Sequence, residues 1–281
     1  MLNSGRGNTM KALTRLFLLM MVVGIAGCVH QARFHATMQA DGWNAQPIPI
    51  ACRFGPDADL DPATKTPVGD EGYYLYILTD IDGPKDYSNT LTVALSFKKN
   101  PGGHSWIMLE SPQNRLEYGH NGNFGQAKLQ YQEGVYQWFR DNHPNPISYL
   151  WEVMDDGRLE TGRPDRTPTF VWRMPITKQR HQLIQEYVLQ RKYDQFSLRD
   201  NNCADMVADA AALAGINLIH RLRLTIPQET TILGKKLWPW TDPKYRILEY
   251  STPDLLQMDL RQLARFGIGI DVTEWYLGLK R

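Results

Sequence analysis

Cysteine is scarce in this chain, and its body has neither a long apolar run nor a basic cluster. The three cysteines, Cys28, Cys52 and Cys203, allow no more than one disulfide. Beyond residue 27, no apolar run approaches the roughly 20 residues that a membrane-spanning helix needs. Lys and Arg are scattered and the formal net charge is +1, so a nucleic-acid partner is not expected.

Motifs for metal or phosphate binding are also missing. No Gly-rich phosphate cradle occurs, and five histidines stand isolated without ligand spacing: His30, His35, His143, His181 and His220. We therefore expect neither a metal nor another cofactor. The chain has no internal repeat and no low-complexity segment. About 250 residues remain after a short leader, enough for one large domain or a domain with a subdomain.

The first residues have the pattern of an export leader. Lys11 and Arg15 supply a positive segment before the apolar residues 16–23. That apolar run is too short to span a bilayer, which needs about 20 residues. It ends in Ile25-Ala26-Gly27-Cys28, a short aliphatic residue and two small residues before a cysteine.

This ending resembles the bacterial lipobox. The resemblance implies a signal peptide over residues 1–27 and cleavage before Cys28. It also implies a diacylglyceryl group on the Cys28 sulfur and an acyl chain such as palmitate on the new N-terminus, a stable anchor because it has more than one chain. Val29 implies, by the same resemblance, the outer membrane, with the protein facing the periplasm. The alternative is an ordinary secretory peptide with a cysteine there by chance.

Residues 28–72 are polar and rich in Pro and Asp, and we interpret them as a tether with irregular structure. Alternating and β-branched residues then predict strands over 73–78, 90–97, 104–110, 116–119, 147–154 and 168–174. The short turn before 116–119 makes it the antiparallel return of 104–110. Thr177 is expected to cap a helix over 178–191, with Leu183, Ile184, Tyr187 and Val188 on its buried face.

Two aromatic segments have open interpretations. Residues 121–146 are expected to form a long loop over the site, where the aromatic side chains either line a binding cleft or only pack on the surface. The second segment, Leu237-Trp238-Pro239-Trp240, is predicted to be an exposed loop within the C-terminal residues 221–281, which we expect to pack on the domain. Within the same region, 222–226 and 245–250 are predicted strands and 255–266 a short helix.

Cys203 opens the segment around which the chain is organised. Asn201 and Asn202 are plausible helix N-caps, apolar residues follow at helical spacing, and Gly215 ends the pattern. In the first turn of a helix, the dipole and the unpaired N–H groups favour a thiolate. Cys203 is therefore a candidate nucleophile. The alternative is a structural disulfide with Cys52, for which the sequence indicates no other role.

His104 is the candidate base for this nucleophile. It begins a predicted strand directly after a Gly-Gly turn, which leaves space beside the imidazole. Glu117, on the return strand, is predicted to orient the far ring nitrogen and to stabilise the imidazolium. His120 is the rival for that role, although its neighbours Gly119, Asn121 and Gly122 suggest a loop.

Together, the segments GGHSWIMLE, LEYG and YDQFSLRDNNCADMVADAAALAGI resemble the circularly permuted papain-like thiol hydrolases. These include permuted NlpC-type, lecithin:retinol-acyltransferase-like and PPPDE-type proteins. The matching residues are the pairs Gly103-His104 and Asn202-Cys203, with Glu117 where relatives carry a third polar residue. The resemblance covers residues 73–220 and implies an α+β fold, an antiparallel sheet packed on a helix that carries the cysteine at its N-terminus.

The resemblance and the residues point to three functions. The first is a Cys–His hydrolase that cleaves amide bonds in a cell-wall peptide or a protein, with His104 accepting the thiol proton. The second is an acyltransferase or thioesterase on lipids. The third is a non-catalytic binding or scaffold lipoprotein. The backbone N–H of Cys203 is expected to be one oxyanion donor, and the sequence does not identify a second.

Overall fold

The computed structural model describes residues 44–47, 53–54, 61, 67–81, 103–122, 153, 155–162, 166–197, 199–218, 221–232, 235–238 and 240–279. Several predictions lie outside these residues: the lipobox with Cys28, Cys52, the strand over 90–97, nearly all of the strand over 147–154, and the loop beyond Gly122. In the described part of the chain, no helix is both long enough and apolar enough to cross a membrane.

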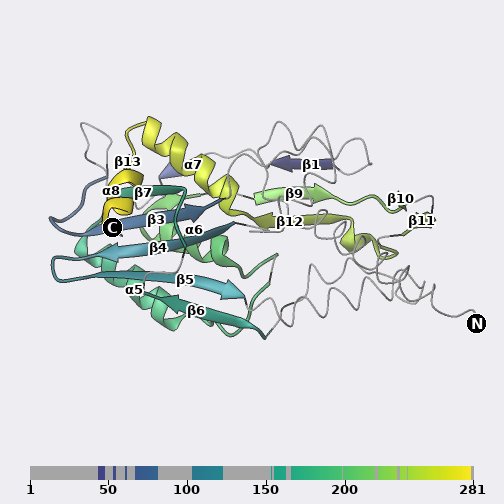
Figure 1. The fold of residues 1–281 in the computed structure, drawn as a ribbon, viewed down its shortest axis with the longest axis horizontal. Helices are drawn as coiled ribbons and strands as arrows, with labels where there is room; N and C mark the ends of the chain where they lie inside the picture. The colour runs from purple at the N-terminus through teal and green to yellow at the C-terminus, as the bar shows by residue number, and fades with distance from the viewer. Residues whose placement is uncertain are drawn as a thin grey trace, which may run out of the picture.

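A six-stranded antiparallel sheet forms the body of the protein (Figure 1). Its order is β13-β7-β3-β4-β5-β6, and every neighbouring pair is antiparallel. The strands are β3 (Tyr74–Asp80), β4 (His104–Glu110), β5 (Arg115–Gly122), β6 (Gly157–Thr161), β7 (Phe170–Pro175) and β13 (Ile270–Asp271). The two central strands, β3 and β4, are buried along nearly their whole length, so they organise the core.

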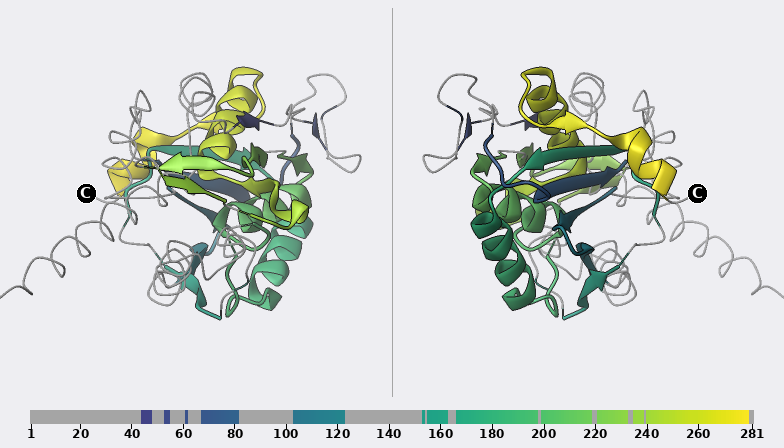
Figure 2. Two further views of the ribbon diagram at one scale, coloured as in Figure 1. Left: turned by 90° about the vertical axis from the view of Figure 1, so that its right-hand side faces the viewer. Right: turned by 90° about the vertical axis from the view of Figure 1, so that its left-hand side faces the viewer.

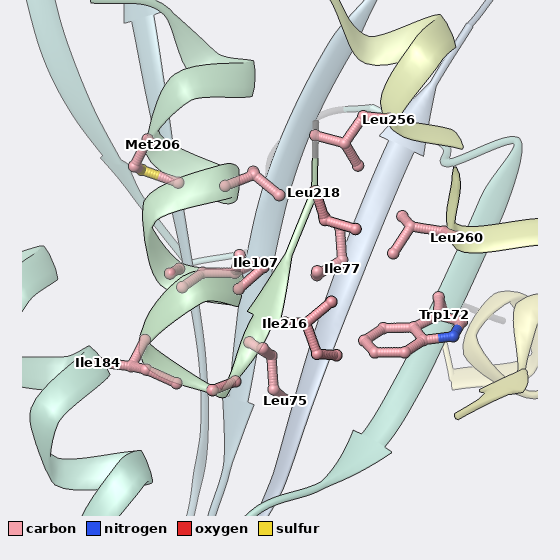
Figure 3. Packing of buried hydrophobic residues seen from close by; sticks show 14 of the residues in the cluster. Leu75, Ile77, Ile107, Trp172, Ile184, Met206, Ile216, Leu218, Leu256 and Leu260 are labelled. Carbon is pink, nitrogen blue, oxygen red and sulfur yellow. The ribbon is translucent and has the colours of Figure 1, made fainter. Parts of the chain in front are cut away.

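Three helices cover one face of this sheet (Figure 2). They are α5 (Lys178–Gln190), α6 (Cys203–Leu213) and α7 (Pro253–Arg265). The alanines of α6 let it lie close to β4, and Ile77, Ile107, Met206 and Leu260 meet in the shared core (Figure 3). On the opposite face, α8 (Thr273–Leu279) inserts Tyr276 among Tyr76, Trp106 and Met108.

A second, smaller sheet stands beside the first. It has the order β1-β9-β12, from β1 (Asn44–Pro47), β9 (Arg221–Thr225) and β12 (Ile247–Ser251). Two short pairs accompany it, β10 (Thr230–Ile232) with β11 (Lys235–Leu237), and β2 (Arg53–Phe54) with β8 (Ile216–Asn217), and the 3-10 turn η2 (Pro243–Tyr245) precedes β12. Ser251 is the last residue of β12 and Thr252 is the N-cap of α7. The chain therefore passes directly from the small sheet into a helix of the main core.

The structure corrects several details of the sequence prediction. Helix α5 does begin after Thr177, but it buries His181, Ile184 and Val188, whereas Leu183 is 43% exposed. Strand β5 continues to Gly122 and includes His120, which was expected in a loop. Trp240 is buried and donates its indole N–H to the carbonyl of Ile226, so it is not part of an exposed loop. Strand β6 was not predicted.

Candidate active site

Cys203 is the first residue of α6, and the local sequence explains why the helix begins there. The Asn202 side chain accepts hydrogen bonds from the N–H groups of Ala204 (2.8 Å) and Asp205 (3.0 Å). Asp205 returns the contact by accepting from the Asn202 N–H at 3.1 Å, which completes a capping box. This arrangement uses the N–H groups of the second and third helical residues. It leaves the N–H of Cys203 as the first-turn donor that the cap does not engage.

Cys203 carries a free thiol that is 8% exposed. Cys203 is therefore not in a disulfide, which removes the structural alternative that the sequence left open for it. Because Cys203 heads a helix, its sulfur lies at the positive end of the dipole. A buried thiol in this position needs a specific partner if it is to ionise, since burial alone favours the neutral form.

His104 is the first residue of β4, directly after Gly103, which has a φ of +66°. A side chain at position 103 would bring its Cβ to 2.8 Å from the carbonyl oxygen of Asp80, so the turn requires glycine. The imidazole is 3% exposed and stacks on Trp106, with ring centroids 5.6 Å apart. Glycine and tryptophan together fix where the imidazole lies.

The structure brings His104 and Cys203 together. Burial disfavours the charged imidazole, but the charge and hydrogen bonding of Cys203, with the hydrogen bond to Glu160, outweigh it and raise the pKa of His104 to about 9. Burial likewise raises the pKa of Cys203, yet the imidazolium of His104 outweighs it and the net shift is downward. Both shifts favour the thiolate–imidazolium pair over the neutral thiol and imidazole.

Glu160 of β6 is the carboxylate that holds His104. Its Oε2 lies 3.0 Å from Nε2 of the imidazole, and its Oε1 accepts a hydrogen bond from Asn121 at 2.6 Å. The hydrogen bond to His104 is the main reason that the pKa of Glu160 falls to about 2, despite the opposing effect of burial. Since Glu160 occupies Nε2, the Nδ1 atom is the ring nitrogen left to serve Cys203.

Gly119 makes this contact possible across an intervening strand. His104 is on β4 and Glu160 on β6, so β5 lies between them, and Gly119 pairs with both Trp106 and Glu160. A Cβ at position 119 would lie 3.1 Å from Glu160 Oε2 and 3.3 Å from His104 Nε2. Any residue other than glycine would therefore crowd the hydrogen bond.

Glu117, the predicted orienting residue, has a different environment. Its carboxylate accepts hydrogen bonds from the indole N–H of Trp106 (3.0 Å) and the hydroxyl of Tyr276 (2.8 Å). The role predicted for Glu117 on β5 is taken by Glu160 on β6, which pairs with Gly119. Glu160 reaches the imidazole because the intervening residue, Gly119, has no side chain. Glu117 instead links the sheet to α8.

His120, the predicted rival, also does not orient His104. Its imidazole is fully buried and packs edge-on against the rings of Tyr193 and Phe196. Burial, with a smaller contribution from Arg191, lowers the pKa of His120 to about 4, so it is neutral at neutral pH. It packs under the loop that leads to Cys203.

Glu160 is the site residue that sequence reasoning missed. It lies in Gly157–Thr161, a segment that is short and partly exposed, so its own sequence does not predict a strand. The one sequence signal related to Glu160 is Gly119, because the missing side chain leaves room for the contact between Glu160 and His104. This signal can be interpreted only when the order of the strands is known.

The fold and the site define an α+β protein with a buried Cys–His pair that a glutamate completes. Comparison of the chain with family models, with curated proteins and with solved structures finds no match. The residues that the structure describes contain no group of three or more His, Cys, Asp or Glu side chains that could hold a metal ion. Cys203, His104 and Glu160 are therefore the residues whose chemistry bears on function.

Proposed function

We propose that this protein is a thiol hydrolase in which Cys203 is the nucleophile, His104 the general base and acid, and Glu160 the group that orients His104. The observation that carries the proposal is the arrangement of three side chains. A cysteine at a helix N-terminus interacts with His104, and Nε2 of that histidine lies 3.0 Å from the carboxylate of Glu160. A nucleophile, a base and an orienting group in this order are the general pattern of covalent acyl transfer.

In the proposed reaction, the Cys203 thiolate attacks the carbonyl carbon of the substrate and forms a tetrahedral oxyanion. The N–H of Cys203, which the helix cap leaves unengaged, donates to that oxygen. The imidazolium of His104 then protonates the leaving group, and a thioester remains on Cys203. His104, now neutral, takes a proton from a water molecule whose oxygen attacks the thioester carbonyl. The C–S bond then breaks, which releases the acid and regenerates the thiolate beside the imidazolium.

The proposed fold is the permuted papain-like one, because a histidine strand precedes a helix that carries the cysteine at its N-terminus. The α+β architecture is compatible with that assignment. The proposed location follows from the lipobox alone: a lipid anchor at Cys28 would hold the protein on the periplasmic face of the outer membrane. That location favours amide bonds of a cell-wall peptide or a protein as substrate.

Reactivity of the thiol tests the proposal. Tryptic cleavage releases residues 200–221, a peptide whose only cysteine is Cys203, so mass spectrometry can follow its alkylation in the full-length chain. We expect iodoacetamide to modify Cys203 at pH 6 faster than it modifies free cysteine, because a depressed pKa leaves more thiolate. His104→Ala should remove this advantage.

A thiol that reacts no faster than free cysteine would refute the proposal and favour a non-catalytic binding protein. Where the thiol is activated, isolated muropeptides and thioester lipid substrates separate amide cleavage from acyl transfer to or from lipids. Cys203→Ser is the matched variant for those assays, because it keeps the size of the side chain but removes the thiolate.

A further inference from the structure

Ser105, the residue after His104, is an unexpected side chain in its position. It lies on the face of β4 that the helices cover, in the same alternating row as Ile107 and Leu109, and it is fully buried. Its hydroxyl oxygen has no directed hydrogen bond in the structure. A buried hydroxyl without a partner destabilises a fold, whereas alanine would fill the same place without that penalty. The serine therefore needs an explanation other than packing.

The sheet opens at this residue. Strands β4 and β5 are paired from Trp106 with Gly119 to Glu110 with Arg115, although β4 begins at His104 and β5 continues to Gly122. The pairing of the two strands thus ends before the first residues of β4, and α6 packs mainly on β4 and also meets β5. Ser105 is the helix-facing residue at this opening.

Cys203 interacts with Ser105. Both the backbone N–H and the hydroxyl of Ser105 help to lower the pKa of Cys203, after the larger effects of burial and of His104. The hydroxyl can turn about the Cα–Cβ bond of the serine, so it can align with the sulfur when a negative charge is present. Hydrogen bonds to a charged group are stronger than those between neutral groups.

We propose that Ser105 is a built-in donor to the sulfur anion, so that its hydroxyl stabilises the Cys203 thiolate of the resting protein. This inference rests on the proposed function, because it assigns a role at the same nucleophile. Ser105 is then a second residue, besides His104, that sets how much thiolate is present. Its otherwise unexplained burial follows from that role, since the charged sulfur supplies an acceptor for the hydroxyl.

The test is the pH dependence of Cys203 alkylation in the full-length protein, read from the tryptic peptide of residues 200–221. Ser105→Ala should move the midpoint of the alkylation rate upward by roughly one pH unit, which lowers the rate below the midpoint about tenfold. The thermal midpoint measured at pH 5 should stay the same or rise, because the variant removes a buried hydroxyl without a directed bond.

Thr79→Val is the matched control. Thr79 pairs with Ser105 across β3 and β4, and its buried hydroxyl donates to Gln257 at 2.7 Å. Removing it should lower the thermal midpoint and leave the alkylation midpoint unchanged, the opposite pattern to Ser105→Ala. An unchanged alkylation midpoint in Ser105→Ala, with an activated wild-type thiol, overturns this inference alone. An ordinary wild-type thiol overturns the proposed function as well.

Discussion

At the scale of single residues, Gly119 is the position where the smallest change should have the largest effect on the site. In Gly119→Ala, the added Cβ would lie 3.1 Å from Glu160 Oε2 and 3.3 Å from both His104 Nε2 and Trp106 Cβ. The His104–Glu160 bond must then lengthen or break. A lost hydrogen bond to a charged group is worth about 1.5–3 kcal/mol, so kcat/KM should fall by about 10- to 150-fold.

Gly278→Ala is the control for this variant, because no atom lies within 4 Å of a Cβ built there. It should leave kcat/KM unchanged. Equal activity of the two variants and the wild-type protein would show that the glycine is not needed for the contact between β4 and β6.

Glu160 should contribute to the alkaline limit of activity. The pKa of His104 is raised to about 9, so the imidazolium is present below that pH and is lost as the pH rises through it. In Glu160→Gln the smaller of the two supports of the imidazolium is gone while that of Cys203 remains, and the alkaline limb of the kcat/KM profile should move to lower pH. Glu117→Gln should not move this limb, because Glu117 binds Trp106 and Tyr276; it should lower the thermal midpoint instead. A common shift in both variants would contradict the assignment.

At the scale of elements, α7 carries a buried carboxyl that should make stability depend on pH. Asp259 is 1% exposed, its Oδ2 has no hydrogen-bond partner, and burial raises its pKa to about 8. The unfolded chain releases this proton near the usual value of 3.8, whereas the folded protein keeps it until about pH 8. The stability that Asp259 contributes is therefore greatest at low pH and declines as the pH rises between these values.

Asp259→Asn should remove this part of the pH dependence. The difference in thermal midpoint between variant and wild-type protein should shift in favour of the variant from pH 5 to pH 8. Using the difference cancels the other titrating groups, among them His104. A difference that is the same at both pH values would mean that Asp259 is ionised in the folded protein.

The elements also show which parts of this fold a sequence can predict. Strands β3, β4 and β7 and helices α5 and α6 have strong alternation or caps, and the prediction placed each of them within a few residues. Strand β6 was missed because Gly157–Thr161 is short, partly exposed and mostly polar, so its own residues give little reason to form a strand. It pairs with β5 in the folded chain, and this pairing is tertiary information. The same omission explains why Glu160 was not predicted while Cys203 and His104 were.

At the scale of the whole molecule, residues 253–279 are part of the core. Leu256, Leu260 and Leu263 of α7 belong to the same buried cluster as β3 and α6, and β13 pairs with β7 as the edge strand of the main sheet. In Leu260→Ala, a fully buried side chain is replaced by a cavity, and the unfolding free energy should fall by about 2–5 kcal/mol in urea denaturation. Leu189→Ala, at a 61% exposed position on α5, is the control and should change it by less than about 0.5 kcal/mol.

The support that α7 and β12 give to the site has a consequence for the order in which chemistry appears during folding. Ser251 donates to Asp205 in the first turn of the cysteine helix, and Pro253 lies beside the glycine that precedes His104. Both residues follow Cys203 in the sequence and belong to elements that dock on the site. A chain in which β12 and α7 have not yet docked is therefore expected to carry an ordinary thiol, and activation of the sulfur should coincide with that docking.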